Sequence, residues 1–150
     1  MSLIFLDTSA VAKRYLAELG STWVMRVVES ATGNIIVIAD VATVEMFSLL
    51  ARRVREGILS STEARSLGNA FLVHAESAYL TAPLDDPTLV RARALVGQYP
   101  LCALDAIQLA SAQVAQSVLG NPIIFVSSDR NLLSAARAEG FTTDDPLAHP

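Results

Sequence analysis

The chain has 150 residues and carries 15 acidic against 11 basic residues, which gives a formal net charge of −4. Its length predicts a single domain over residues 1–150 with a substantial core. This excess of acidic residues argues against a protein that coats nucleic acid without specificity, because such a protein would be basic. No apolar run approaches the ~18 residues that a membrane-spanning helix needs.

The cysteine and histidine content indicates the cellular compartment and limits the kinds of metal site that the chain can form. Cys102 is the only cysteine, which excludes an internal disulfide and is typical of a reducing compartment. The start of the chain lacks the basic residues and the cleavage site of a signal peptide, so we expect a cytoplasmic protein. His74 and His149 stand far apart in different contexts, which argues against a zinc site.

The first half of the chain alternates apolar runs with helical patterns. Continuous apolar runs predict parallel strands that are covered on both faces, and a 3.6-residue period predicts helices. In chain order these are a strand over 2–6, helices over 10–19 and 22–31, a strand over 35–39 and a helix over 41–56.

The second half continues the alternation. Ser60 and Glu63 form a capping box that opens a helix, and Gly68 weakens the helical pattern in its middle. The predicted elements are a helix over 61–78, a strand over 79–84, helices over 86–97 and 103–119, a strand over 123–127, a helix over 130–139 and an edge strand over 141–143. The whole pattern predicts an α/β sandwich with a mostly parallel sheet.

Four acidic residues stand inside or at the ends of apolar runs, namely Asp7, Glu45, Asp105 and Asp129. An unpaired carboxylate in apolar surroundings would take up a proton, so four of them in one small domain indicate a shared cation. Asp7 and Asp129 follow predicted strands, and the other two open helices that can lean over the same edge. Ligands of open parallel sheets bind at that edge.

Each of these carboxylates also has a purely structural interpretation. Asp7 and Asp129 can cap the helices that follow them, and Glu45 and Asp105 can favour a helix start through the dipole. If the four do converge, oxygen ligands without histidine or cysteine favour Mg²⁺ or Mn²⁺ over Zn²⁺. Such a site can activate water and neutralise phosphate charge, so a metal-dependent nuclease is the leading chemistry.

Four segments, LDTSAVAKRY, VATVEMFSLLARR, LCALDAIQLASA and FVSSDRNLLSAAR, together resemble PIN-domain ribonucleases over about residues 3–140. The resemblance is greatest to the VapC-type toxins of toxin–antitoxin pairs. It implies a three-layer α/β/α fold that cleaves RNA with Mg²⁺ or Mn²⁺. By position, Asp7, Glu45 and Asp105 match the metal-binding core, and Asp129 matches a more variable fourth acid.

The resemblance extends to hydroxyl side chains and to partners. Thr8 and Ser9 follow the first aspartate, and Ser127 matches a position that often holds Thr or Ser. Their hydroxyls can orient a water or the substrate phosphate, with helix capping as the alternative. The resemblance also implies a homodimer, a small VapB-like antitoxin that covers the active site, and no membrane association.

Two other polar residues near the acidic positions have structural interpretations. Gln108 follows Asp105 by one helical turn, so it can face the cleft, although we favour a helix-surface amide. Arg52 lies on nearly the same helix face as Glu45, where it can bind RNA phosphate or, as we favour, pair with Glu56 on a solvated face.

Other functional classes fit the sequence less well. A haloacid-dehalogenase-type phosphatase needs a second acid where Ser9 stands. A receiver domain needs a lysine late in the chain, whereas Lys13 is the only lysine. The remaining alternative to a nuclease is a non-catalytic PIN-like module that binds RNA or protein.

Overall fold

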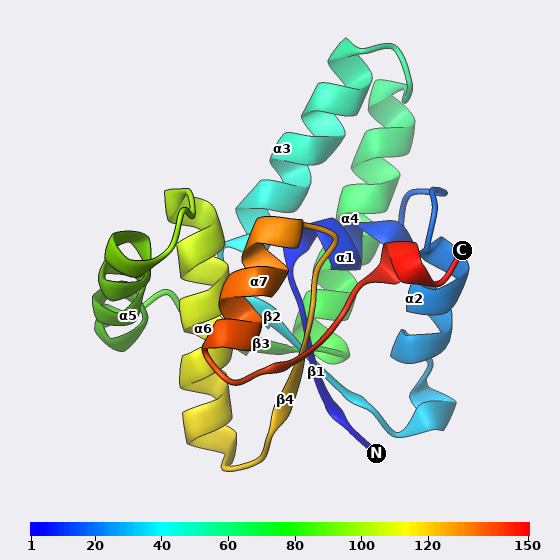
Figure 1. Cartoon of the computed structure of the whole chain (residues 1–150). Helices are drawn as coiled ribbons and strands as arrows, with labels where there is room; N and C mark the ends of the chain where they lie inside the picture. Colours follow the sequence, from blue (N-terminus) through cyan, green and yellow to red (C-terminus); the bar gives the residue numbers. More distant parts are fainter.

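A sheet of five parallel strands lies at the centre of the computed structural model, which describes residues 1–150 (Figure 1). The strand order is β3-β2-β1-β4-β5, and every neighbouring pair is parallel. The strands are β1 (Leu3–Leu6), β2 (Ile35–Ala39), β3 (Leu80–Ala82), β4 (Ile123–Val126) and β5 (Thr142–Asp144).

Helices cover both faces of this sheet (Figure 1). They are α1 (Thr8–Val11), α2 (Ser21–Val28), α3 (Ala42–Arg55), α4 (Ser61–Ser77), α5 (Asp86–Gln98), α6 (Ala103–Leu119) and α7 (Arg130–Ala138), with short 3₁₀ helices at Ala12–Arg14, Ser30–Thr32 and Pro146–Ala148. Helices α1 to α4 pack on one face, and α5 to α7 pack on the other. The three-layer α/β/α arrangement is thereby confirmed. None of the helices combines the length and apolar character that crossing a bilayer demands.

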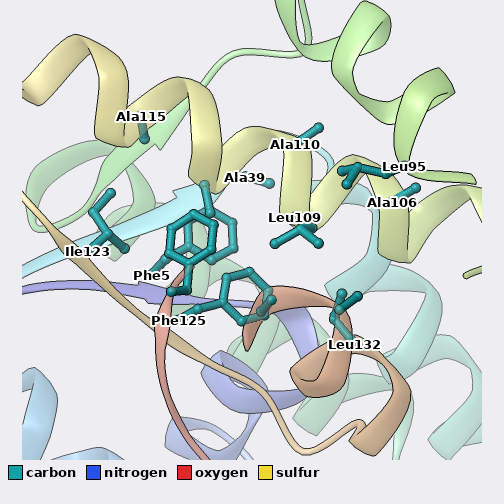
Figure 2. Packing of buried hydrophobic residues seen from close by; sticks show 14 of the residues in the cluster. Phe5, Ala39, Leu95, Ala106, Leu109, Ala110, Ala115, Ile123, Phe125 and Leu132 are labelled. Carbon is teal, nitrogen blue, oxygen red and sulfur yellow. The ribbon is translucent and has the colours of Figure 1, made fainter. Parts of the chain in front are cut away.

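The side chains of β1 alternate between two hydrophobic cores, as the pleat of a strand requires. Ile4 and Leu6 join the core under α3 and α4, whereas Phe5 joins the core under α6. Figure 2 shows Phe5 and Phe125 stacked beneath the small residues of α6, with ring centroids 5.3 Å apart. Alanines such as Ala106 and Ala110 let α6 approach the sheet closely, which fixes where its first turn stands.

One predicted helix is wrong. In place of a helix over 10–19, the chain forms the single turn α1, the 3₁₀ helix Ala12–Arg14 and then a loop. Ala10, Val11 and Ala12 are all buried in succession, so tertiary packing and not an amphipathic period determines this segment. A 3₁₀ turn is a common way to end a short helix.

The other differences are shifts of element ends. The helix predicted over 22–31 ends at Val28. The strand predicted over 79–84 shortens to β3, and the edge strand predicted over 141–143 moves by one residue to β5. Helix α4 continues through Gly68 because the ring of Phe47 packs there. A Cβ on Gly68 would stand 2.8 Å from Phe47 Cε1, so the glycine makes room for the neighbouring helix.

Candidate active site

The candidate site lies at the carboxyl edge of the sheet, where β1 and β4 end side by side. Leu6 pairs with Val126 in the sheet, and each strand is followed within three residues by an aspartate, Asp7 or Asp129. The strand that follows β1 in sequence, β2, lies on its other side. The gap between β1 and β4 is therefore a topological switch point, where parallel sheets bind ligands.

A cavity of about 600 Å³ opens at this edge, and we call it the acidic cavity. All four of the singled-out carboxylates line it: Asp7, Glu45, Asp105 and Asp129. Two come from loops after strands. The other two come from the first turns of α3 and α6. The structure thus brings together residues that are up to 122 positions apart, counting from 7 to 129.

Asp7 is the most buried of the four, with only 4% of its surface exposed. Its Oδ1 accepts hydrogen bonds from Ser9 Oγ (2.7 Å) and from the backbone N–H of Ala10 (2.9 Å), so it caps α1. Its Oδ2 accepts from Ser127 Oγ at 2.6 Å. Burial raises the pKa of Asp7 to about 6, although these three bonds act to lower it.

Serine hydroxyls tie the loop after β1 to the loop after β4. Ser127 Oγ donates to Asp7 and accepts from the backbone N–H of Asp129 at 3.0 Å. Ser9 Oγ accepts from the backbone N–H of Ser128 at 3.0 Å. Asp129 in turn caps α7 by accepting from the N–H of Leu132. Asp7 and Asp129 therefore both act as helix caps while lining the cavity.

Glu45 is held by two side chains from other elements. Thr8 Oγ1 donates to Glu45 Oε1 at 3.0 Å, and Gln108 Nε2 donates to the same oxygen at 2.8 Å. Gln108 Nε2 also donates to Thr8 Oγ1 at 2.9 Å. The favoured prediction that Gln108 is a surface amide is wrong, because it is 2% exposed and lines the acidic cavity, as the alternative interpretation expected.

The acidic residues influence one another electrostatically. The pKa of Asp105 is raised, first by burial and further by the negative charge of Asp129, while a hydrogen bond from Cys102 acts to lower it. The charge of Asp105 in turn contributes to the raised pKa of Asp7. The three aspartates thus concentrate negative charge that a cation would relieve.

The donor set fits a hard divalent cation, since every candidate ligand is an oxygen. No three acidic, histidine or cysteine side chains yet stand close enough to hold a metal ion. Mutual repulsion of carboxylates favours such a separation, and Glu45 is turned towards Thr8 and Gln108. Binding of one ion by all four would therefore need the carboxylates to approach one another. Thr8 and Gln108 hold only Oε1 of Glu45, and its Oε2 makes no hydrogen bond.

Three cationic side chains also line the acidic cavity. Lys13 is 6% exposed and pairs with Glu18 at 3.2 Å. We assigned it no role from the sequence, although it is the only lysine and lies within the segment LDTSAVAKRY. Glu56 pairs with Arg53 at 3.2 Å, whereas Arg52, for which we favoured that pairing, lines the cavity without an ion pair.

Comparison with known proteins identifies the class. The sequence matches the PIN-domain family over residues 4–138. It is also 30% identical to ribonuclease VapC47 of Mycobacterium tuberculosis, across 97% of this chain and 98% of that protein. The chain therefore belongs to the PIN-domain family. Within the family, its similarity is to the VapC type of ribonuclease, as the sequence motifs indicated.

Solved structures agree on the fold. VapBC2 from Rickettsia felis, bound to a promoter DNA fragment, matches with a TM-score of 0.65 at 11% identity, over 95% of this chain and 98% of that one. A toxin–antitoxin complex from Klebsiella pneumoniae matches with a TM-score of 0.61 at 15% identity, over 95% and 97%. At these identities the likeness concerns the fold alone.

Proposed function

We infer that the protein is a VapC-type endoribonuclease that hydrolyses RNA phosphodiester bonds at the acidic cavity. The observation that carries this proposal is the convergence of four carboxylates at the carboxyl ends of β1 and β4. Membership of the PIN-domain family and similarity to a protein named a ribonuclease support it.

We propose that the four carboxylates hold Mg²⁺ or Mn²⁺, with Asp7, Glu45 and Asp105 as the core ligands and Asp129 as the fourth. Such a cation would supply an activated water and neutralise charge on the phosphate and the leaving oxygen. The hydroxyls of the neighbouring residues keep the ligands in place. Thr8 holds Glu45, and Ser9 and Ser127 hold Asp7.

The cations around the cavity are suited to an RNA backbone. Arg52 lacks a carboxylate partner, so its guanidinium is free to make the bidentate phosphate contact for which arginine is well shaped. Lys13 is held beside the same cavity by Glu18. We propose that these two side chains contact phosphates on either side of the cleaved bond.

We further propose that a small antitoxin of the VapB kind covers this cavity and that two copies of the chain form a dimer. The structural similarity to VapBC2 and to a protein described as a toxin–antitoxin complex supports the first part. Large apolar side chains exposed on and between α3 and α4 also suit a protein partner: Val44, Phe47, Ile58, Leu72 and Val73. The single free cysteine fits the reducing cytoplasm.

The decisive experiment compares Asp105→Asn with the parent protein in RNA cleavage assays with Mn²⁺. We expect a loss of more than about 100-fold, because even outer partners of metal ligands contribute 10- to 100-fold. Asp86→Asn, an exposed aspartate at the start of α5, is the matched control and should cleave normally.

Two outcomes would contradict the proposal. Cleavage by Asp105→Asn at the parental rate would exclude the acidic cavity as the active site. A parent protein with neither an Mn²⁺-dependent thermal shift nor cleavage would instead be a non-catalytic PIN-like module.

A further inference from the structure

Gln108 joins three segments that meet at the acidic cavity. It lies on α6, one turn after Asp105, and its Nε2 bridges Glu45 on α3 and Thr8 after β1 at 2.8 and 2.9 Å. Thr8 also donates to Glu45 at 3.0 Å. Three polar groups, from positions separated by as many as 100 residues, thus form a closed triangle of hydrogen bonds.

The other end of the Gln108 amide has no partner. Its Oε1 is buried and accepts no hydrogen bond, which is unfavourable for a polar atom in a protein interior. Rotating the amide by half a turn would place Oε1 against the Glu45 carboxylate, where two acceptors repel. The negative charge of Glu45 therefore fixes the orientation of the amide.

Stability alone does not account for this residue. An apolar side chain of the same size would fill the space at position 108 without leaving an unpaired oxygen. What such a side chain lacks is the N–H group that faces Glu45 and Thr8. What glutamine provides, and an apolar side chain does not, is therefore a hydrogen bond to the Glu45 carboxylate.

We propose that Gln108 is a positioning residue that fixes the Glu45 carboxylate for binding a divalent cation. This inference rests on the proposed function and assigns the residue that orients one of its ligands. Groups that hydrogen-bond to metal ligands typically change metal affinity or activity by about 10- to 100-fold. Gln108 acts through Glu45 and has no contact with substrate of its own in this scheme.

The test is Gln108→Met, which keeps the length of the side chain and removes the N–H donor. We expect the metal-free variant to melt at or above the parental temperature, because the unpaired oxygen is gone. Its Kd for Mn²⁺, measured by calorimetry, should rise about 10- to 100-fold. In cleavage at fixed subsaturating Mn²⁺, kcat should fall while KM for RNA stays unchanged.

Two comparisons separate positioning from packing. Gln113→Met is the matched control, because Gln113 is on the same helix and donates to Glu139 instead; its Mn²⁺ affinity should equal that of the parent. In a Glu45→Ala background, Gln108→Met should change Mn²⁺ affinity by less than about twofold, since interacting residues are non-additive. Gln108→Leu, a second donor-free replacement, should repeat the result of Gln108→Met.

The outcomes also distinguish this inference from the proposed function. If the parent binds Mn²⁺ and both Gln108 variants bind it equally well, the positioning role is wrong and the proposed function stands. The positioning role is also wrong if the variants lose melting temperature without losing Mn²⁺ affinity. If the parent itself binds no Mn²⁺, both the proposed function and the inference fall.

Discussion

The Asp7 carboxylate combines a structural role with an unfavourable environment. It caps α1 and accepts three hydrogen bonds, yet burial still raises its pKa to about 6 from an ordinary value of 3.8. The free-energy cost of removing the charged carboxylate from water therefore exceeds the stabilisation that its three hydrogen bonds provide. In the absence of a cation, the folded protein binds this proton more tightly than the unfolded chain does.

This linkage predicts that Asp7→Asn stabilises the metal-free protein at neutral pH. Well below pH 3.8 the parent carboxyl is protonated in both states and contributes nothing. Between pH 3.8 and about 6 the unfolded chain loses this proton while the folded protein keeps it, so the free energy of unfolding falls, by up to about 3 kcal/mol above pH 6. Asparagine also caps helices well. Denaturant unfolding in EDTA at pH 4 and pH 7.5 should show a small gain at pH 4 and nearly the whole gain at pH 7.5. An equal gain in the free energy of unfolding at both pH values would contradict the linkage.

At the residue scale, the acidic positions were predictable from the sequence, and the hydroxyls of Thr8, Ser9 and Ser127 from the family resemblance. The contacts of Gln108 were not. A carboxylate such as Asp105 inside an apolar run conflicts with its surroundings, and that conflict is visible in the sequence. An amide such as Gln108 is ordinary on any helix. Its partners Thr8 and Glu45 are 100 and 63 positions away, so only the tertiary structure reveals what it does.

At the element scale, the start of α2 is fixed by a close contact with the C-terminal segment. Gly20 precedes α2 with a positive φ of 88°, and a Cβ there would lie 2.5 Å from the backbone oxygen of Pro146. His149 stacks on Trp23 of α2 at 4.4 Å. Local periodicity could not show this contact, nor the burial of Ala10–Ala12 that replaces the helix predicted over 10–19. The three continuous apolar strands, by contrast, were predicted to within one residue.

We expect Gly20→Ala to destabilise the protein by about 2 to 4 kcal/mol, because left-handed backbone strain adds to the clash with Pro146. The matched control is Gly120→Ala, since Gly120 also has a positive φ (68°) but nothing within 4 Å of its Cβ position. It should lose only about 1 to 2 kcal/mol. Equal losses in denaturant unfolding would mean that the contact with Pro146 does not matter.

At the scale of the whole molecule, the charge is acidic overall but locally mixed. The net charge of −4 disfavours binding of nucleic acid over the surface at large. Lys13, Arg52 and Arg53, by contrast, line the acidic cavity. RNA affinity in the proposed function should therefore depend on few phosphate contacts, all near the cavity.

This arrangement predicts a shallow salt dependence of RNA binding. For the cleavage-deficient Asp105→Asn protein, a plot of log affinity against log salt should have a slope between about −1 and −2, because single strands contribute roughly −0.7 per phosphate contact. Arg52→Gln should make the slope shallower by about 0.7, measured by fluorescence anisotropy. Arg26→Gln, an exposed arginine on α2, should leave it unchanged; a slope unaffected by Arg52→Gln would place the RNA elsewhere.

The central position of β1 has a consequence for how the protein is made. β1 is synthesised early but pairs with β4, and Asp7 receives its shortest hydrogen bond from Ser127, 120 positions later. Domains fold as units during synthesis at roughly 5–20 residues per second. The chain emerging from the ribosome therefore cannot complete its acidic cavity until β4 and the loop after it have emerged. Any activity of that cavity consequently begins only after β4 and the loop that follows it have been synthesised.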